Sequence, residues 1–126
     1  MMDVIVSYGR KEAIEDGVLI DVSTLASEAG FIFPVAMTNA LYGKVGDIPE
    51  DFSHQDLTGR LWDILFVASV TARNSKGDVM FFEVDIPHVV IEEGEKTLKE
   101  VLVIKSIIGP GDQMEPVITM MLPNED

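Results

Sequence analysis

The fold of this chain is decided by one stretch, residues 53–73, which reads SHQDLTGRLWDILFVASVTAR. Ser53 and Asp56 have the spacing of the N-cap and N3 residues of a capping box, which predicts that a helix begins there. Apolar residues then recur at helical spacing as far as Arg73. They form two neighbouring apolar sides, one with Leu57, Leu61, Ile64, Leu65 and Ala68, the other with Trp62, Phe66 and Val70. A helix with so little polar surface must be covered on more than one side, so we expect a central helix or, in part, an oligomer interface.

The chain after residue 78 has the pattern of β-structure. Apolar residues alternate with Glu83 and Asp85 between Met80 and Ile86, which is typical of a strand with one buried face. Pro87 should mark a bulge or an edge position, because proline has no amide hydrogen to give to a neighbouring strand.

Two further strands follow, and the last two are separated by a turn. An antiparallel sheet is expected from residues 79–86, 98–108 and 116–122. Packed against a helix at residues 54–73, and joined by short helices, this sheet gives an α+β fold. The core should contain Leu61, Trp62, Leu65, Phe82, Val84, Leu102, Ile104 and Ile118.

Short elements are expected before residue 53. They are a helix over residues 10–16 ended by Gly17, a strand over 18–22, a helix over 24–29 capped by Ser23, and a helix over 39–45 capped by Thr38. The apolar residues 31–37 contain Pro34, which argues against a central strand but allows an edge strand or the first turn of a helix. No repeat or linker divides the chain, so residues 1–126 are expected to form a single α+β domain.

Composition limits the possible functions. The chain has 126 residues, 22 acidic against 9 basic, no cysteine, and a formal net charge of -13. Without cysteine there can be no disulfide, thiolate nucleophile or iron–sulfur cluster, and a cytoplasmic protein is the plain expectation. No signal peptide or membrane-spanning run is recognisable, so no membrane contact is expected. The charge repels phosphate, which predicts a protein partner of basic character and no direct nucleic-acid binding.

The segment Gly-Arg-Leu-Trp-Asp at residues 59–63 is the first candidate interaction site. Arg60, Trp62 and Asp63 would form a recognition patch, since Trp and Arg often anchor interfaces. The favoured alternative buries Trp62 in the core and leaves Arg60 as a surface ion pair with Asp63 or with Asp56, both at helical spacing.

A second candidate is the loop of Gly109, Pro110, Gly111 and Asp112, with Glu115 close behind. It resembles an anion-binding loop only superficially, because the lysine, the Ser/Thr and the following helix are missing. Its carboxylates could hold a divalent cation, but the calcium-loop pattern is absent. A shaped turn is the favoured interpretation, and no metal or cofactor is expected.

No sequence motif points to catalysis. His54 stands near Asp51 and Asp56 and could serve a small hydrolase or a metal-dependent enzyme, although an exposed residue is the simpler interpretation. His88 follows Pro87 at the expected bulge. The spacings of zinc proteases, serine hydrolases and dinucleotide-binding proteins do not occur, so the chain is expected not to be an enzyme.

Acidic residues gather in several clusters. They are Glu12, Glu15 and Asp16; Asp47, Glu50, Asp51 and Asp56; Glu92, Glu93 and Glu95; and Glu125 with Asp126. If they line one face, they could imitate a phosphate backbone and block a DNA-binding defence protein. If they are spread around the surface, they only keep the protein dispersed.

Four segments resemble a family of small bacterial proteins of unknown function that also occur in phages and plasmids. They are AIEDGVLIDV at residues 13–22, EAGFIFPVAMT at 28–38, GRLWDIL at 59–65, and GPGD at 109–112 with EPVIT at 115–119. The resemblance implies a one-domain protein often carried on mobile elements, and no known activity. We therefore expect a non-catalytic binding or regulatory protein, and the surplus apolar surface predicts a homodimer.

Overall fold

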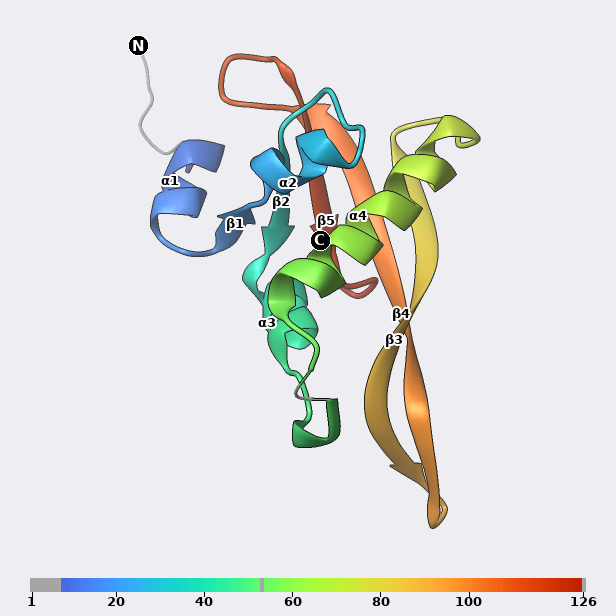
Figure 1. Ribbon diagram of the computed structural model, residues 1–126. Helices are drawn as coiled ribbons and strands as arrows, with labels where there is room; N and C mark the ends of the chain where they lie inside the picture. Colours follow the sequence, from blue (N-terminus) through green and yellow to red (C-terminus); the bar gives the residue numbers. More distant parts are fainter. Residues whose placement is uncertain (1–7, 53, 126) are drawn as a thin grey trace.

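A computed structural model describes residues 8–52 and 54–125. The helices are α1 (Arg10–Glu15), α2 (Ser23–Glu28), α3 (Asn39–Gly46), the short 3-10 helix η1 (Glu50–Phe52) and α4 (Leu57–Arg73). The strands are β1 (Leu19–Asp21), β2 (Val35–Thr38), β3 (Val79–Glu92), β4 (Glu95–Pro110) and β5 (Pro116–Met121). The fold is α+β, as the sequence predicts, and the long helix α4 crosses the sheet diagonally (Figure 1).

The strands form one sheet in the order β1-β2-β5-β4-β3. The pairs β3–β4 and β4–β5 are antiparallel, which confirms the three-strand prediction. The sheet as a whole is mixed, however, because β2 pairs in parallel with β5. The chain must travel from β2 through α3, α4 and the β3–β4 hairpin before it returns to this position.

The interpretation of residues 31–37 as an edge strand is wrong. Strand β2 lies between β1 and β5, and its first three residues, Val35, Ala36 and Met37, are buried. Pro34 directly precedes the strand, so its missing amide hydrogen costs no ladder bond. Its carbonyl oxygen still accepts a hydrogen bond from the Ile118 amide at 2.9 Å.

Local capping signals set most helix boundaries. The Thr38 hydroxyl accepts a hydrogen bond from the Leu41 amide at 3.3 Å, as expected of the N-cap of α3. Gly17 ends the α1 segment with a positive φ of 78°. Ser23 is not the expected N-cap, because it is the first residue of α2 and its hydroxyl donates to Asp21 Oδ1 at 2.6 Å.

Helix α4 begins later than predicted. Its N-cap is Asp56, whose carboxylate accepts a hydrogen bond from the Gly59 amide at 2.6 Å. Asp56 therefore takes the role that the capping-box prediction gave to Ser53, and Ser53 itself lies outside the described residues. The helix starts at residue 57, because the Asp56 carboxylate accepts a hydrogen bond from one of the free amides of its first turn.

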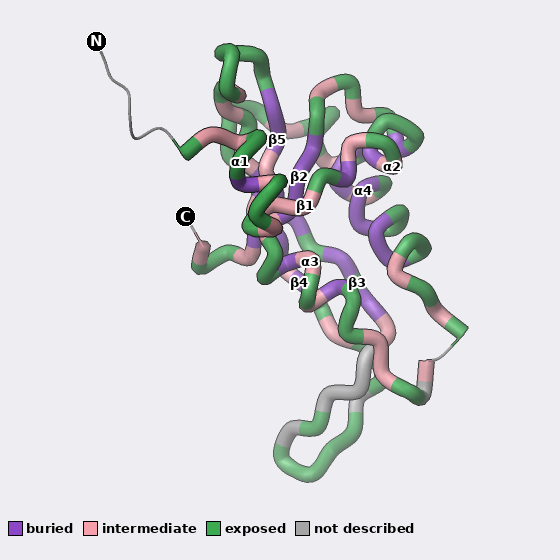
Figure 2. Tube along the Cα trace, turned by 90° about the vertical axis from the view of Figure 1, so that its left-hand side faces the viewer, coloured by how far each residue is buried: buried purple, intermediate pink, exposed green. Residues whose placement is uncertain are grey.

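The core lies between the sheet and helices α2, α3 and α4. Seven of the eight predicted core residues belong to it: Leu61, Leu65, Phe82, Val84, Leu102, Ile104 and Ile118. Trp62 does not, because it is 37% exposed. The long β3–β4 hairpin leaves this core, and its far end is exposed and extends beyond the other elements (Figure 2). Pairing in the hairpin shifts register between Pro87 and Val90, as the sequence predicts for a bulge at Pro87.

Candidate interaction surface

Arg60 is a buried structural residue. Only 3% of it is exposed, and its guanidinium donates hydrogen bonds to the Val45 carbonyl at 3.1 Å, to Gln55 Oε1 at 2.9 Å and to the Pro87 carbonyl. Burial lowers the pKa of Arg60, although the nearby Asp47 and Glu100 oppose this effect. The predicted surface ion pairs of Arg60 are therefore wrong, because its side chain joins α4 to the end of α3 and to β3.

Trp62, in contrast to the buried Arg60, lies on an exposed ridge of α4. Trp62, Phe66 and Val70 follow one another at four-residue spacing and are all exposed. The rings of Trp62 and Phe66 lie 6.1 Å apart, centroid to centroid, at a tilt of 32°. The second apolar side found in the sequence is thus a real feature of the helix, but no described element covers it.

A groove of about 470 Å³ separates this ridge from strand β3. It is lined by Asp63, Phe66, Val67, Glu83, Val84 and Asp85. Asp85 pairs with Lys99 at 3.3 Å, whereas Asp63 and Glu83 form no ion pair with any described residue. We call these residues, together with Trp62 and Val70, the α4–β3 surface. It combines exposed aromatic area with two carboxylates, those of Asp63 and Glu83, that form no ion pair within the described part of the chain.

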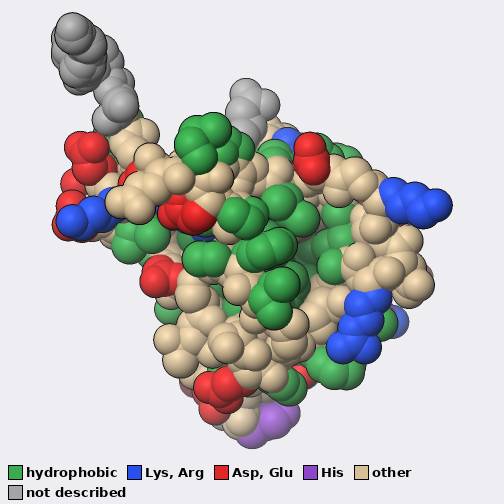
Figure 3. Space-filling model, turned by 90° about the horizontal axis from the view of Figure 1, so that it is seen from above, with side chains coloured by type: hydrophobic (Ala, Val, Ile, Leu, Met, Phe, Trp, Pro, Cys, Tyr) green, Lys and Arg blue, Asp and Glu red, His purple; other side chains and the backbone are tan. Residues whose placement is uncertain are grey.

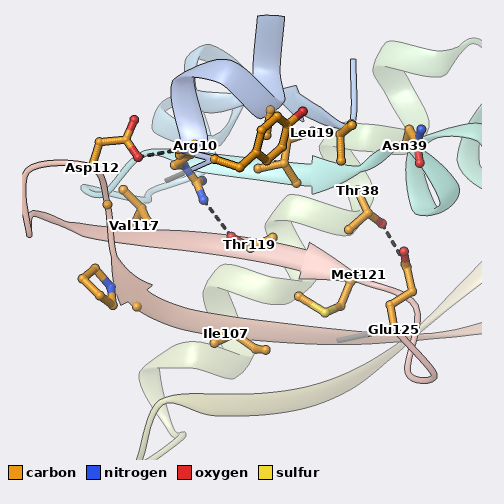
Figure 4. A pocket seen from close by; sticks show the side chains of 17 residues that line it. Arg10, Leu19, Thr38, Asn39, Ile107, Asp112, Val117, Thr119, Met121 and Glu125 are labelled. Carbon is orange, nitrogen blue, oxygen red and sulfur yellow. Dashed lines mark hydrogen bonds between the residues drawn. The ribbon is translucent and has the colours of Figure 1, made fainter. Parts of the chain in front are cut away.

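The loop after β4 has a different role, which is to hold α1. The carboxylate of Asp112 accepts a hydrogen bond from the Arg10 amide at 2.7 Å (Figure 4) and another from the Lys11 amide at 3.0 Å. These bonds, that of Lys11 foremost, hold the pKa of Asp112 below its ordinary value. Gly9 must be small here, because a Cβ atom on it would lie 2.9 Å from Asp112 Oδ1.

Glu115 closes the same loop. Its carbonyl accepts a hydrogen bond from the Gly111 amide at 2.6 Å, and its carboxylate accepts one from the Gln113 amide at 2.8 Å. A Cβ atom on Gly111 would lie 2.5 Å from the Glu115 carboxyl carbon. The turn lies slightly later than expected, since Gly109 and Pro110 still pair with β5. The carboxylates of Asp112 and Glu115 thus both accept hydrogen bonds from backbone amides of this chain.

A hollow of about 630 Å³ lies between α1, β5 and the C-terminal segment (Figure 4). The Arg10 guanidinium crosses it to Thr119 Oγ1 and to the Ile118 carbonyl, both at 2.7 Å. At the other end, the Thr38 hydroxyl donates to Glu125 Oε2 at 2.8 Å. The bonds of Arg10 to β5 and of Thr38 to Glu125 thus fasten α1 and the C-terminal segment to the sheet. Sequence patterns did not point to Arg10, whose partners lie more than one hundred residues away.

A further apolar hollow, of about 230 Å³, lies at the end of the molecule beside the C-terminal turn of α4. It is lined by Gly30, Phe31, Ile32, Phe33, Ser69, Ala72, Arg73, Ile108 and Ile118. Ile32 is 87% exposed. Figure 3 shows apolar side chains gathered at this end, with basic side chains on the right flank and mostly acidic ones on the left.

The histidines form no chemical cluster in the described part of the chain. His54 is exposed and packs beside Phe52, with ring centroids 6.3 Å apart. Asp56 is engaged as the cap of α4, while the side chains of Asp51 and His88 lie outside the described residues. Among residues 8–52 and 54–125, no group of three or more histidine, cysteine or acidic side chains is placed to hold a metal ion.

Comparison with known families shows which family the chain matches over its whole length. A family model described as "Family of unknown function (DUF6573)" covers residues 1–126. The chain belongs to this family. Membership confirms the resemblance to proteins of unknown function, and it brings no activity with it. Neither a curated protein nor a solved structure matches the chain. Within the described residues, the helices of this family member are too short or too polar to cross a membrane.

Proposed function

We propose that this protein acts by contact and binds a basic protein partner through the α4–β3 surface. The observation that carries the proposal is the exposed Trp62–Phe66 pair at the groove that Asp63 and Glu83 also line. Neither of these two carboxylates forms an ion pair with a described residue. Trp is among the residues that most often anchor interfaces, and cations of the partner would meet the free carboxylates.

The energetics favour such a contact. Full burial of one large apolar side chain contributes about 1.5–3 kcal/mol to the free energy of binding. The rings of Trp62 and Phe66 are both exposed on the ridge and could be buried by a partner. The formal net charge of -13 attracts basic proteins over distances comparable to the Debye length, about 10 Å at moderate salt. Burial of apolar area would then provide the binding affinity. The charges would raise the association rate and favour basic partners over others.

The acidic clusters lie at separate places. The exposed members with described side chains are Glu12, Glu15 and Asp16 on and after α1, Asp47, Glu50 and Asp56 in and around η1, and Glu93 and Glu95 at the hairpin end (Figure 1). A DNA mimic needs carboxylates in one row at phosphate spacing. The scattered arrangement supports a binding or regulatory subunit, acting in a mobile element or its host, more than an anti-defence mimic.

The test is a comparison of binding by matched variants. Proteins captured from a lysate of the organism that carries the gene would be purified and titrated against wild type by calorimetry. Trp62→Ala with Phe66→Ala should lose the partner, and raised salt should weaken binding. Val18→Ala, an exposed apolar residue directly before β1 at the opposite edge of the sheet, is the control and should bind normally. Undiminished binding by the double variant, or tight binding of wild type to duplex DNA, would overturn the proposal.

A further inference from the structure

Strand β3 is an edge of the sheet, since β4 alone pairs with it among the strands that the structure describes. The phase of its hydrogen bonds follows from one bond at its start, which the Ile108 amide donates to the Asp78 carbonyl at 2.8 Å. In an antiparallel ladder, directly opposite residues that exchange such bonds alternate with residues whose backbone groups point away. The register Val79↔Ile107 continues unbroken as far as Pro87. The amides and carbonyls of Val79, Phe81, Glu83 and Asp85 therefore face the free edge.

The free edge has a defined end. The backbone of Pro87 also faces the free edge, but proline has no amide hydrogen to donate. The Pro87 carbonyl already accepts a hydrogen bond from the Arg60 guanidinium. The register shift follows immediately. An added strand could therefore pair with residues 79–86 and no further along this segment.

Side chains along the edge have an ordered pattern. Val79 and Phe81 are apolar and exposed, Phe81 to 57%, whereas Glu83 and Asp85 are acidic and exposed. All four side chains project from the sheet face away from α4, because the alternate residues, among them Phe82 and Val84, enter the core. Since β3 lies at the edge of the sheet, Glu83 and Asp85 nevertheless also line the α4–β3 groove. On the α4 side, the edge borders the groove with Asp63, Phe66 and Val67.

We propose that a basic extended segment of the partner adds to the sheet as a strand antiparallel to β3. This inference rests on the proposed function and specifies how the partner binds. Directly opposite side chains share a face, so cations would stand opposite Glu83 and Asp85, and apolar or hydroxyl residues opposite Phe81 and Val79. The intervening residues would point into the groove and pack on Phe66 and Val67. Backbone bonds supply affinity and side chains supply selectivity in this mode of recognition.

A second copy of this chain does not fit the same edge. When residues 79–85 of two copies pair antiparallel through their free edges, Glu83 of one copy lies diagonally across from Glu83 of the other. In the shorter register that pairs residues 81–85, the two Glu83 side chains stand directly opposite each other, where like charges destabilise a sheet. Charged residues on an edge are a common defence against such self-pairing. The same charges become attractive when the added strand is basic.

The probe is a synthetic peptide, acetyl-Lys-Val-Lys-Val-Thr-Val-Thr-amide, whose first lysine is placed opposite Asp85. Trp62, the only tryptophan, reports binding by its fluorescence, and NMR hydrogen exchange reports protection of the amides of Phe81, Glu83 and Asp85. One matched peptide carries N-methyl groups at the second lysine and the first threonine, whose amides would face β3. The other carries them at the second and third valines, whose amides would face away.

We expect the first N-methylated peptide to bind about tenfold or more weakly than the parent, because two hydrogen bonds are lost. The second should bind like the parent, and Glu83→Lys should weaken binding of all three peptides. Equal affinity of the two methylated peptides would overturn strand addition while leaving contact at the α4–β3 surface intact. No binding of the parent peptide would also overturn strand addition. The proposed function itself is tested by a separate experiment, the titration of the Trp62→Ala, Phe66→Ala double variant with the natural partner.

Discussion

The guanidinium of Arg60 donates a hydrogen bond to the carbonyl oxygen of Pro87, and so ties the first turn of α4 to β3 where the hairpin shifts register. The same side chain also donates hydrogen bonds to the carbonyls of Val45, in the last turn of α3, and of Asp47, directly after the helix. One buried cation thus fastens three elements together. It also marks the end of the free edge of β3.

Replacement of Arg60 by methionine should destabilise the fold. The substitution keeps most of the volume but leaves several buried carbonyl groups without a donor, which costs about 2–4 kcal/mol in the free energy of unfolding. Urea denaturation followed by circular dichroism measures this loss. Arg73→Met, an exposed arginine of the same helix, is the control and should change stability by less than about 0.5 kcal/mol. Equal stability of the two variants would contradict the structural role of Arg60.

Asp112 should make stability depend on acid pH. Its pKa is lowered in the folded protein from an ordinary value of 3.8, so its contribution is fully present above that value and is lost as pH falls through the lower folded pKa. Asp112→Asn should therefore lower the melting temperature at neutral pH. The gap to wild type should close only below about pH 4.

The control for this pH series is Glu28→Gln, which alters an exposed carboxylate with no hydrogen bond to any described residue. Its melting curve should follow wild type at every pH. A gap between Asp112→Asn and wild type that stays constant down to strongly acid pH would show that the carboxylate does not cap α1 as described.

Trp62 should be accessible to solvent in the native protein. Because 37% of it is exposed, acrylamide should quench its fluorescence without unfolding, and urea should raise the quenching constant only modestly. Trp62→Phe should abolish the signal, since the chain has no other tryptophan. Fluorescence that resists acrylamide until the protein unfolds would restore the buried position expected from sequence.

The homodimer stays a prediction, and we propose that its contact is the apolar hollow around Ile32. In a two-fold contact, the basic flank of one copy would face the acidic flank of the other (Figure 3). Light scattering should give about twice the chain mass of 13.9 kDa for wild type and the single mass for Ile32→Glu. Ile91→Glu, on the exposed hairpin end, should leave the dimer intact. A wild-type mass near 13.9 kDa at micromolar concentration would contradict the proposal.

Local patterns in the sequence determined much of the secondary structure. Alternation over residues 79–86 predicts a strand that keeps Phe82 and Val84 buried, because side chains of a strand alternate between faces whatever lies around them. The Thr38 cap likewise acts within one turn of its own helix. The sequence also showed that α4 has two apolar sides. It did not show which of the two sides other elements would cover.

Only the tertiary structure decided what lies far apart in sequence. The parallel pairing of β2 with β5 and the bond from the Arg10 amide to Asp112 join residues separated by most of the chain, and no local period records them. Burial of Arg60 and exposure of Trp62 depend on where α3 and β3 pack around α4. Arg60 could be buried because backbone carbonyls there satisfy its charge, whereas Trp62 stays exposed because no described element reaches its side of the helix.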